Sequence, residues 1–176
     1  MSTKIFKIIP AVALAFTFLA CSFLTSQFTS RPSTSEIEKE EQAVYSFFVS
    51  GSDPVLILQN TSTNISDDDS QQMVDSIKSS FKEVSNETLD SYVERNKEPS
   101  QLSPDMDLGV KYVLLSQPET GGYFMFSRVG FNNALDQALV YVGHVAAPLA
   151  GSGSYYLMEK KDGEWTIKEE IMVWIS

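Results

Sequence analysis

Cysteine and histidine are nearly absent from this chain, which contains one of each among 176 residues. Structural zinc sites, disulfide scaffolds and Cys–His catalysis need several such side chains, so the sequence predicts no metal site and no cofactor, and we identify no catalytic residue set. Basic residues are also scarce, because 13 Lys and Arg stand against 23 Asp and Glu, with a formal net charge of −10. Nucleic acid is therefore not an expected partner, since basic side chains supply that affinity.

Apolar residues, by contrast, are abundant. Hydrophobic residues make up 43% of the chain and aromatic residues 11%, which is too apolar for a disordered protein. The length suits one domain of ordinary size.

The N-terminus has the layout of a secretory signal. Lys4 and Lys7 form a short basic region, and residues 8–20 are an apolar stretch without charge. We therefore expect a signal peptide at 1–20. An uncleaved membrane anchor is the alternative, because extension of the run through Leu24 brings it near the ~20 residues that span a bilayer.

The only cysteine, Cys21, follows this run directly. Together with Phe18-Leu19-Ala20 it resembles a bacterial lipobox, which implies that Cys21 is acylated, becomes the mature N-terminus and holds the protein at a membrane. The alternative is an inert cysteine within a cleaved signal, with a soluble periplasmic or secreted product. Residues 21–34 are rich in Ser and Thr and predict an extended tether, so the folded domain is expected at 35–176.

The pattern of the domain changes from helical to extended along the chain. Ser35 begins a capping-box pattern and predicts a helix to Val49, and further helices are expected after the acidic run 67–69 and after Ser85. Strands are expected at 55–58, 110–115, 123–131, 138–145, 154–160, 164–169 and 171–175, with Asp162-Gly163 as a hairpin turn. This order predicts an α+β fold, with N-terminal helices packed on a curved antiparallel sheet of five to six strands, formed mainly by the C-terminal half.

The C-terminal half carries a recognisable combination of segments. SRVGFN at 127–132, QALVYVG at 137–143, GSGSYYL at 151–157, DGEW at 162–165 and the ending WIS together resemble a group of uncharacterised exported bacterial proteins. The resemblance implies export and a strand-rich ending, and it implies no activity. The Gly163-Glu164-Trp165 hairpin is also similar to one in the cone-shaped fold of nuclear-transport-factor-2-like proteins, as an architectural analogy only.

Two lone polar residues lie on the predicted strands. His144 is either a general base or pH-sensitive contact, or a structural histidine near a strand end, and alternation places it on one face with Val140 and Val142. Arg128 is either an anion-binding residue in a sheet cavity or half of a structural ion pair, since an unpaired buried charge is very costly. Candidate carboxylate partners are Glu159, Glu169 and Glu170.

Aromatic residues are concentrated on adjacent predicted strands, at Tyr141, Tyr155, Tyr156, Trp165 and Trp174. They predict either a groove for an apolar or sugar ligand, or cross-strand packing. The candidate ligand-contacting residues are Arg128, His144, Tyr141, Tyr155 and Trp165.

Acidic runs have simpler interpretations. The three aspartates at 67–69 cap a helix, because calcium loops alternate ligands with spacers. Glu36, Glu38, Glu40 and Glu41 are interpreted as the solvated face of the first helix.

These observations favour a non-enzymatic binding or accessory module of the bacterial cell envelope, anchored through Cys21, with an unknown protein or small-molecule partner. One alternative is an enzyme that uses Arg128 or His144 with a nearby carboxylate. Another is a structural component of the envelope.

Overall fold

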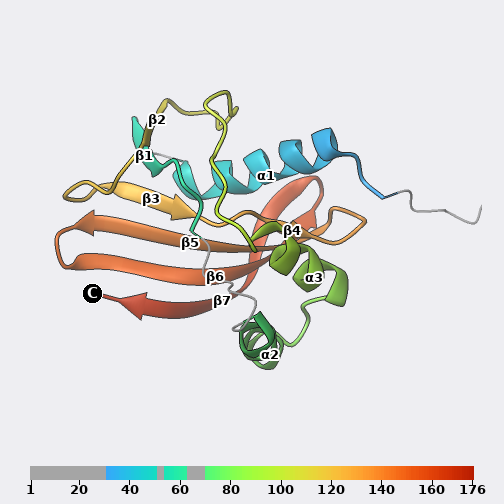
Figure 1. Ribbon diagram of the computed structural model, residues 1–176. Helices are drawn as coiled ribbons and strands as arrows, with labels where there is room; N and C mark the ends of the chain where they lie inside the picture. Colours follow the sequence, from blue (N-terminus) through green and yellow to red (C-terminus); the bar gives the residue numbers. More distant parts are fainter. Residues whose placement is uncertain (1–30, 51–53, 63–69) are drawn as a thin grey trace, which may run out of the picture.

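The computed structural model describes residues 31–50, 54–62 and 70–176, which form three helices and a seven-stranded sheet (Figure 1). The predicted signal peptide, Cys21 and the acidic cap at 67–69 lie outside the described residues. The helices are α1 Thr34–Val49, α2 Ser70–Ser80 and α3 Asn86–Arg95. The strands are β1 Val55–Leu58, β2 Tyr112–Leu115, β3 Tyr123–Phe126, β4 Gly130–Phe131, β5 Gln137–Ala147, β6 Ala150–Lys161 and β7 Glu164–Ile175.

The sheet has the order β2-β1-β3-β5-β6-β7, and β4 pairs with β5. Strands β3, β5, β6 and β7 run antiparallel to one another in this order, which confirms the predicted α+β class with a sheet formed mainly by the C-terminal half. Strand β1 pairs in parallel with both β2 and β3. The expected antiparallel sheet is therefore mixed at this edge, because the chain crosses α2 and α3 between β1 and β2.

The predicted strands differ from the observed ones most at two places. The expected strand at 123–131 is broken after Phe126, where α3 approaches so closely that a Cβ on Gly130 would collide with the backbone of Tyr92. The two strands expected between 164 and 175 are one strand, β7, which follows β6 through two irregularities in register. The predicted Asp162-Gly163 turn is confirmed, and both residues have the positive φ, 53° and 88°, of a tight hairpin turn.

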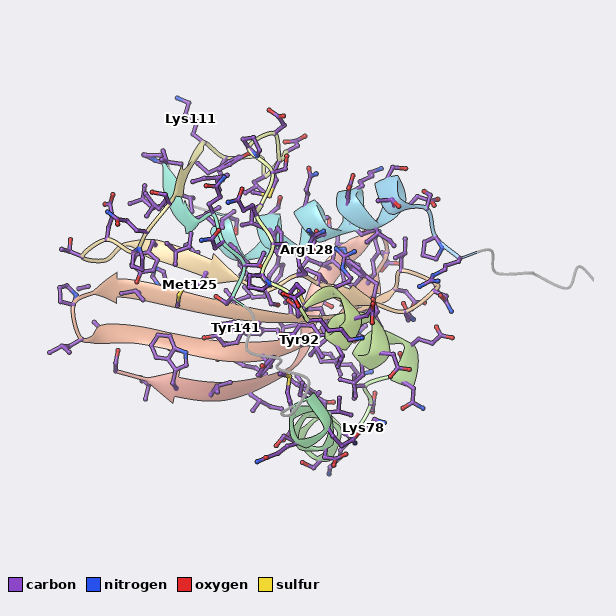
Figure 2. The ribbon with its side chains drawn as sticks, viewed as in Figure 1. Lys78, Tyr92, Lys111, Met125, Arg128 and Tyr141 are labelled. Atoms are coloured by element: carbon purple, nitrogen blue, oxygen red, sulfur yellow. The ribbon has the colours of Figure 1, made fainter. Side chains whose placement is uncertain are left out.

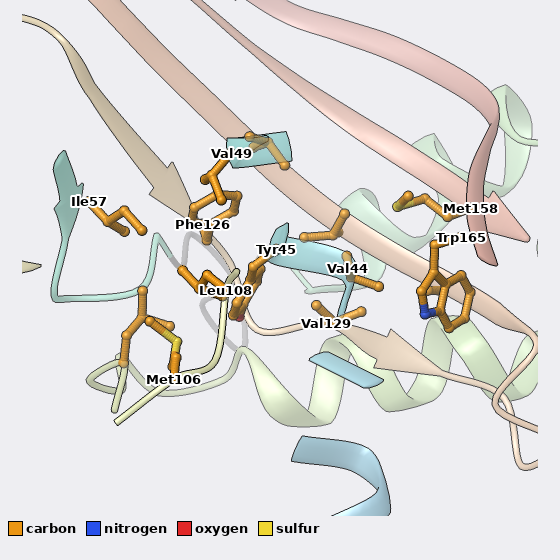
Figure 3. Packing of buried hydrophobic residues seen from close by; sticks show 14 of the residues in the cluster. Val44, Tyr45, Val49, Ile57, Met106, Leu108, Phe126, Val129, Met158 and Trp165 are labelled. Atoms are coloured by element: carbon orange, nitrogen blue, oxygen red, sulfur yellow. The ribbon is translucent and has the colours of Figure 1, made fainter. Parts of the chain in front are cut away.

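Helices cover both faces of the sheet. On the first face, α1 places Val44, Tyr45 and Val49 in one core cluster with Phe126 and Val140 (Figure 3). On the second face, α3 and α2 pack against Leu139 and Leu157. Neighbouring residues of β5 enter opposite clusters because successive strand side chains point to opposite faces.

The helix caps show how local sequence sets these elements. Helix α3 begins as predicted, with the Ser85 side chain accepting from the Thr88 amide. The predicted cap of α1 is wrong by two residues, because Ser33 forms the capping box with Glu36. Ser33 has extended backbone geometry and places Glu36 three positions later, as this box requires. Among the described residues, no helix is both long and apolar enough to cross a membrane.

Candidate functional site

Arg128 lies in the break between β3 and β4 and is paired with Glu41 of α1. Its Nη2 lies 2.8 Å from Glu41 Oε2, and its Nε donates to Oε1 at 2.9 Å. Burial lowers the pKa of Arg128, but the charge and hydrogen bond of Glu41 more than offset this and raise it. Of the alternatives left open for Arg128, the structure shows an ion pair, and its partner is none of the three glutamates named from the sequence.

Glu41 also holds two further donors. Arg95 Nη2 and the Val129 amide each donate to Oε1 at 2.9 Å. Glu41 is only 5% exposed, so the interpretation of this residue as part of a solvated face is wrong. A carboxylate with four donors around it has little capacity left for proton transfer or for a ligand, and we interpret it as the junction between α1, α3 and the strand break.

The same junction is closed by neutral hydrogen bonds. Asn96 accepts from the Arg128 amide and donates to the Arg128 carbonyl, both at 2.9 Å. The Tyr45 hydroxyl donates to the Ser127 carbonyl at 2.8 Å, and burial raises the Tyr45 pKa well above its usual value. A hollow of about 400 Å³ beside Tyr45 and Arg128 is lined by three carboxylates and one guanidinium, so the charge of this hollow does not suit an anion.

Trp165 is a core residue on the first face of the sheet. It is 6% exposed and donates its indole N–H to Glu40 at 2.9 Å. Lys160 donates to the other oxygen of Glu40 at 2.6 Å and lies over the Trp165 ring. Glu40 therefore joins α1 to the β6–β7 hairpin, and its interpretation as a solvated residue is wrong as well.

His144 is separated from the other candidates. It faces the first side of the sheet, where its ring stacks on Phe124 with centroids 4.4 Å apart. Tyr141, three residues earlier, points to the second side. The structure therefore places His144 on the opposite side of the sheet from Tyr141 and Tyr155, and its ring contact is with Phe124 rather than with Arg128.

Tyr141, Tyr155 and Trp174 form one aromatic platform on the second face of the sheet. The Trp174 indole N–H donates to the Tyr141 hydroxyl at 2.6 Å, and the Tyr141 and Tyr155 rings are 5.4 Å apart. Tyr155 also contacts Tyr92 of α3, with ring centroids 5.9 Å apart. Tyr141, in the middle of β5, and Trp174, next to the end of β7, are both half-buried. The ends of β5, β6 and β7 at the β5–β6 turn extend beyond α2 and α3 (Figure 1).

Glycines make room for this platform. A Cβ on Gly153 would collide with both Trp174 Nε1 and the Tyr141 hydroxyl, and one on Gly151 would lie 3.2 Å from Trp174 Cζ3. The indole therefore extends across both glycine positions. On the neighbouring strand, Gly143 accommodates Met125, which lies near Tyr141 in the side-chain view (Figure 2).

Two of the five candidate ligand-contacting residues, Tyr141 and Tyr155, lie in the platform. The third member, Trp174, is not among those five. Trp174 takes the place expected for Trp165. A sequence signal for this existed in the Gly151-x-Gly153 pair, since glycines two apart in a strand leave space on one face for a large ring.

The phenols of Tyr155, in the platform, and of Tyr92, behind it, are protonated at neutral pH. Burial raises the pKa of Tyr155, and it raises the pKa of Tyr92 well above its usual value. Because the Trp174 indole N–H is already donated to the Tyr141 hydroxyl and Tyr92 is buried, the polar group that the platform offers to a ligand is the Tyr141 hydroxyl. This chemistry suits binding of a neutral polar molecule.

Comparisons with family models, with curated proteins and with solved structures find no match for this chain. The resemblance to exported bacterial proteins therefore stays a prediction. Within the described part of the chain, no three His, Cys, Asp or Glu side chains are grouped as metal ligands are.

Proposed function

We propose that this protein is a non-enzymatic binding module of the bacterial cell envelope, exported and held at a membrane through acylated Cys21, and that it binds a neutral saccharide on the aromatic platform. The observation that carries the proposal is the Trp174 ring, which extends across Gly151 and Gly153 and is fixed by its hydrogen bond to Tyr141. A broad aromatic ring held parallel to a sheet offers a pre-organised stacking surface.

The chemistry of the platform favours a sugar over a purely apolar ligand. A sugar ring has a C–H face that packs on an aromatic ring and hydroxyls at its edge that need partners. The Tyr141 hydroxyl accepts from Trp174 and still has its own proton to donate. A few fixed polar groups beside an aromatic surface are typical of small-molecule sites.

Charge favours a neutral sugar. The chain has a formal net charge of −10, and no Asp, Glu, Lys or Arg occurs between Gln137 and Met158. The field of the protein repels anionic polysaccharides, and no local basic residue of this segment offsets it.

The binding part of the proposal is tested by calorimetric titration of the full-length lipoprotein in detergent. The probes are chitohexaose and cellohexaose, with a hexamer of galacturonic acid as the charged counterpart. We expect saturable binding of a neutral hexamer and none of the acid. Trp174→Leu removes the ring and is expected to abolish binding, whereas the matched control Trp165→Phe, at the buried tryptophan, retains it. Absence of binding to both neutral hexamers, or equal binding by Trp174→Leu, contradicts the proposal.

The anchoring part is tested by the mass of the N-terminal peptide from membrane fractions. A diacyl or triacyl adduct on Cys21 is the expected result. An unmodified chain cut near Ala20 contradicts anchoring and leaves a secreted binding module.

A further inference from the structure

The turn between β5 and β6 is apolar and fully exposed. Residues 146–150 are Ala, Ala, Pro, Leu and Ala, all five are exposed, and Leu149 reaches 90% exposure. Ile175 of β7, which pairs with Ser152 at the start of β6, is 73% exposed, and Val173 is 54% exposed. We call residues 146–150 with Val173 and Ile175 the apolar tip.

Neither folding nor solubility accounts for Leu149. It has φ 60°, in the left-handed region where glycine or asparagine is favoured, and its side chain buries almost nothing against the protein. The turn at the other end of β6 has Asp162-Gly163, which suits the same backbone region. A strained, exposed leucine at one turn and a well-adapted sequence at the other indicate that Leu149 is retained for a contact outside the domain.

The geometry of the chain indicates what this contact is. Figure 1 shows the apolar tip at the opposite end of the sheet from the start of α1. β6 has 12 residues and is ~40 Å long, at ~3.3 Å per residue. Residues 21–33, which join Cys21 to α1, have a maximum reach of ~45 Å. An anchored domain can therefore lie along a membrane with its tip against the same bilayer.

We propose that the apolar tip inserts into the interfacial layer of a lipid bilayer, so that the domain contacts its membrane both through the lipid anchor and through Leu149. This inference rests on the anchoring part of the proposed function and is independent of saccharide binding. No Asp, Glu, Lys or Arg occurs between Gln137 and Met158, so insertion of residues 146–150 desolvates none of these charged side chains. The acidic net charge favours neutral lipids such as phosphatidylcholine over anionic ones.

The test uses the full-length lipoprotein reconstituted in phosphatidylcholine vesicles. An environment-sensitive fluorophore is attached at Leu149→Cys, since acylation blocks the thiol of Cys21, the only native cysteine. The matched control carries the fluorophore at Asp162→Cys, in the turn at the other end of β6. We expect a blue shift and protection from iodide at position 149, and neither at 162. Ile175→Asp is expected to weaken the shift at position 149, and so is replacement of a third of the lipid by phosphatidylglycerol.

The outcomes separate this inference from the proposed function. An acylated protein whose label at 149 stays in water overturns tip insertion and leaves the anchor standing. If the native chain carries no acyl groups, the anchor is overturned. The label at position 149 is then placed in a Cys21→Ser background, and a shift of this label at high lipid concentration supports insertion. A label that shifts only when membrane proteins are added overturns the lipid contact in favour of a protein partner.

Discussion

Two regions of the sheet, the junction around Arg128 and the aromatic platform, differ in how their polar and glycine residues are used. At the junction around Arg128, Glu41 is buried with four donors around it, and Gly130 fits the backbone of α3. At the platform, Gly151 and Gly153 leave room for side chains instead, and those side chains, Trp174 and Tyr141, remain half-exposed. The sheet therefore has one region where Glu41 and its donors are paired internally, although the buried Arg95 Nε has no hydrogen-bond partner among the described residues, and another region whose aromatic side chains stay half-exposed. The difference separates residues that hold the architecture from residues that can bind.

The largest effect is expected at the junction. Glu41→Ala leaves Arg95 and Arg128 without their carboxylate and is expected to lower the free energy of unfolding by about 3 kcal/mol. Denaturant unfolding measures this loss. Glu38→Ala removes the same charge from an exposed position of α1 and is expected to cost about 0.5 kcal/mol or less. Equal losses for the two variants contradict the structural assignment of Glu41.

Gly153→Ala tests the other end of the comparison. Its Cβ collides with Trp174 and Tyr141, so we expect a loss of about 2 kcal/mol and displacement of the indole. In a Trp165→Phe background, where Trp174 is the remaining tryptophan, the emission spectrum reports the displacement. Ser152→Ala, on the opposite face of the same strand, is the control and should leave the spectrum unchanged. Saccharide binding is expected to disappear with Gly153→Ala and to persist with Ser152→Ala.

Alkaline pH is expected to weaken the fold through its buried phenols. Burial raises the pKa of Tyr45, Tyr92 and Tyr155, while the same groups ionise near their usual value of ~10 in the unfolded chain. The stability that these neutral phenols contribute to the fold is therefore fully present below about pH 10, and it is lost as the pH rises above that value. Each fully buried tyrosine is expected to lower the free energy of unfolding by on the order of 1 kcal/mol at pH 11. Denaturant unfolding midpoints between pH 8 and 11 measure how steeply the stability falls with pH. Tyr92→Phe should make this fall less steep, and an unchanged pH dependence contradicts a role for the buried phenols.

The smallest effect is expected at the apolar tip. Leu149→Asn places a residue that tolerates positive φ at the turn and is expected to raise stability by about 1 kcal/mol or less. Thermal unfolding measures the gain. If the variant is less stable than the wild type, Leu149 packs within the domain, contrary to its exposure.

Local features were predictable from sequence, and distant ones were not. The Ser85 cap and the Asp162-Gly163 turn depend on a few neighbouring residues, so their patterns suffice. The partner of Arg128 is 87 residues away on α1, and no local pattern distinguishes Glu41 from the exposed Glu38.

The two tryptophans show the same limit for the candidate site. Alternation along β7 predicts that side chains point to two faces, but not which face each helix covers. Trp165 contacts Glu40 of α1 and is buried, whereas Trp174 lies half-buried on the second face against Tyr141 and the two glycines. The sequence could name both residues as aromatic candidates, and only the packing of the helices distinguishes them.

We propose that the platform is a binding surface and not only a packed aromatic cluster. The most direct measurement is a titration of Trp165→Phe, whose remaining tryptophan is Trp174, with chitohexaose and cellohexaose while the emission of Trp174 is followed. We expect a saturable shift of the emission, and we expect it to disappear when Gly153→Ala is added. No shift with either hexamer, or a shift that persists with Gly153→Ala, contradicts it.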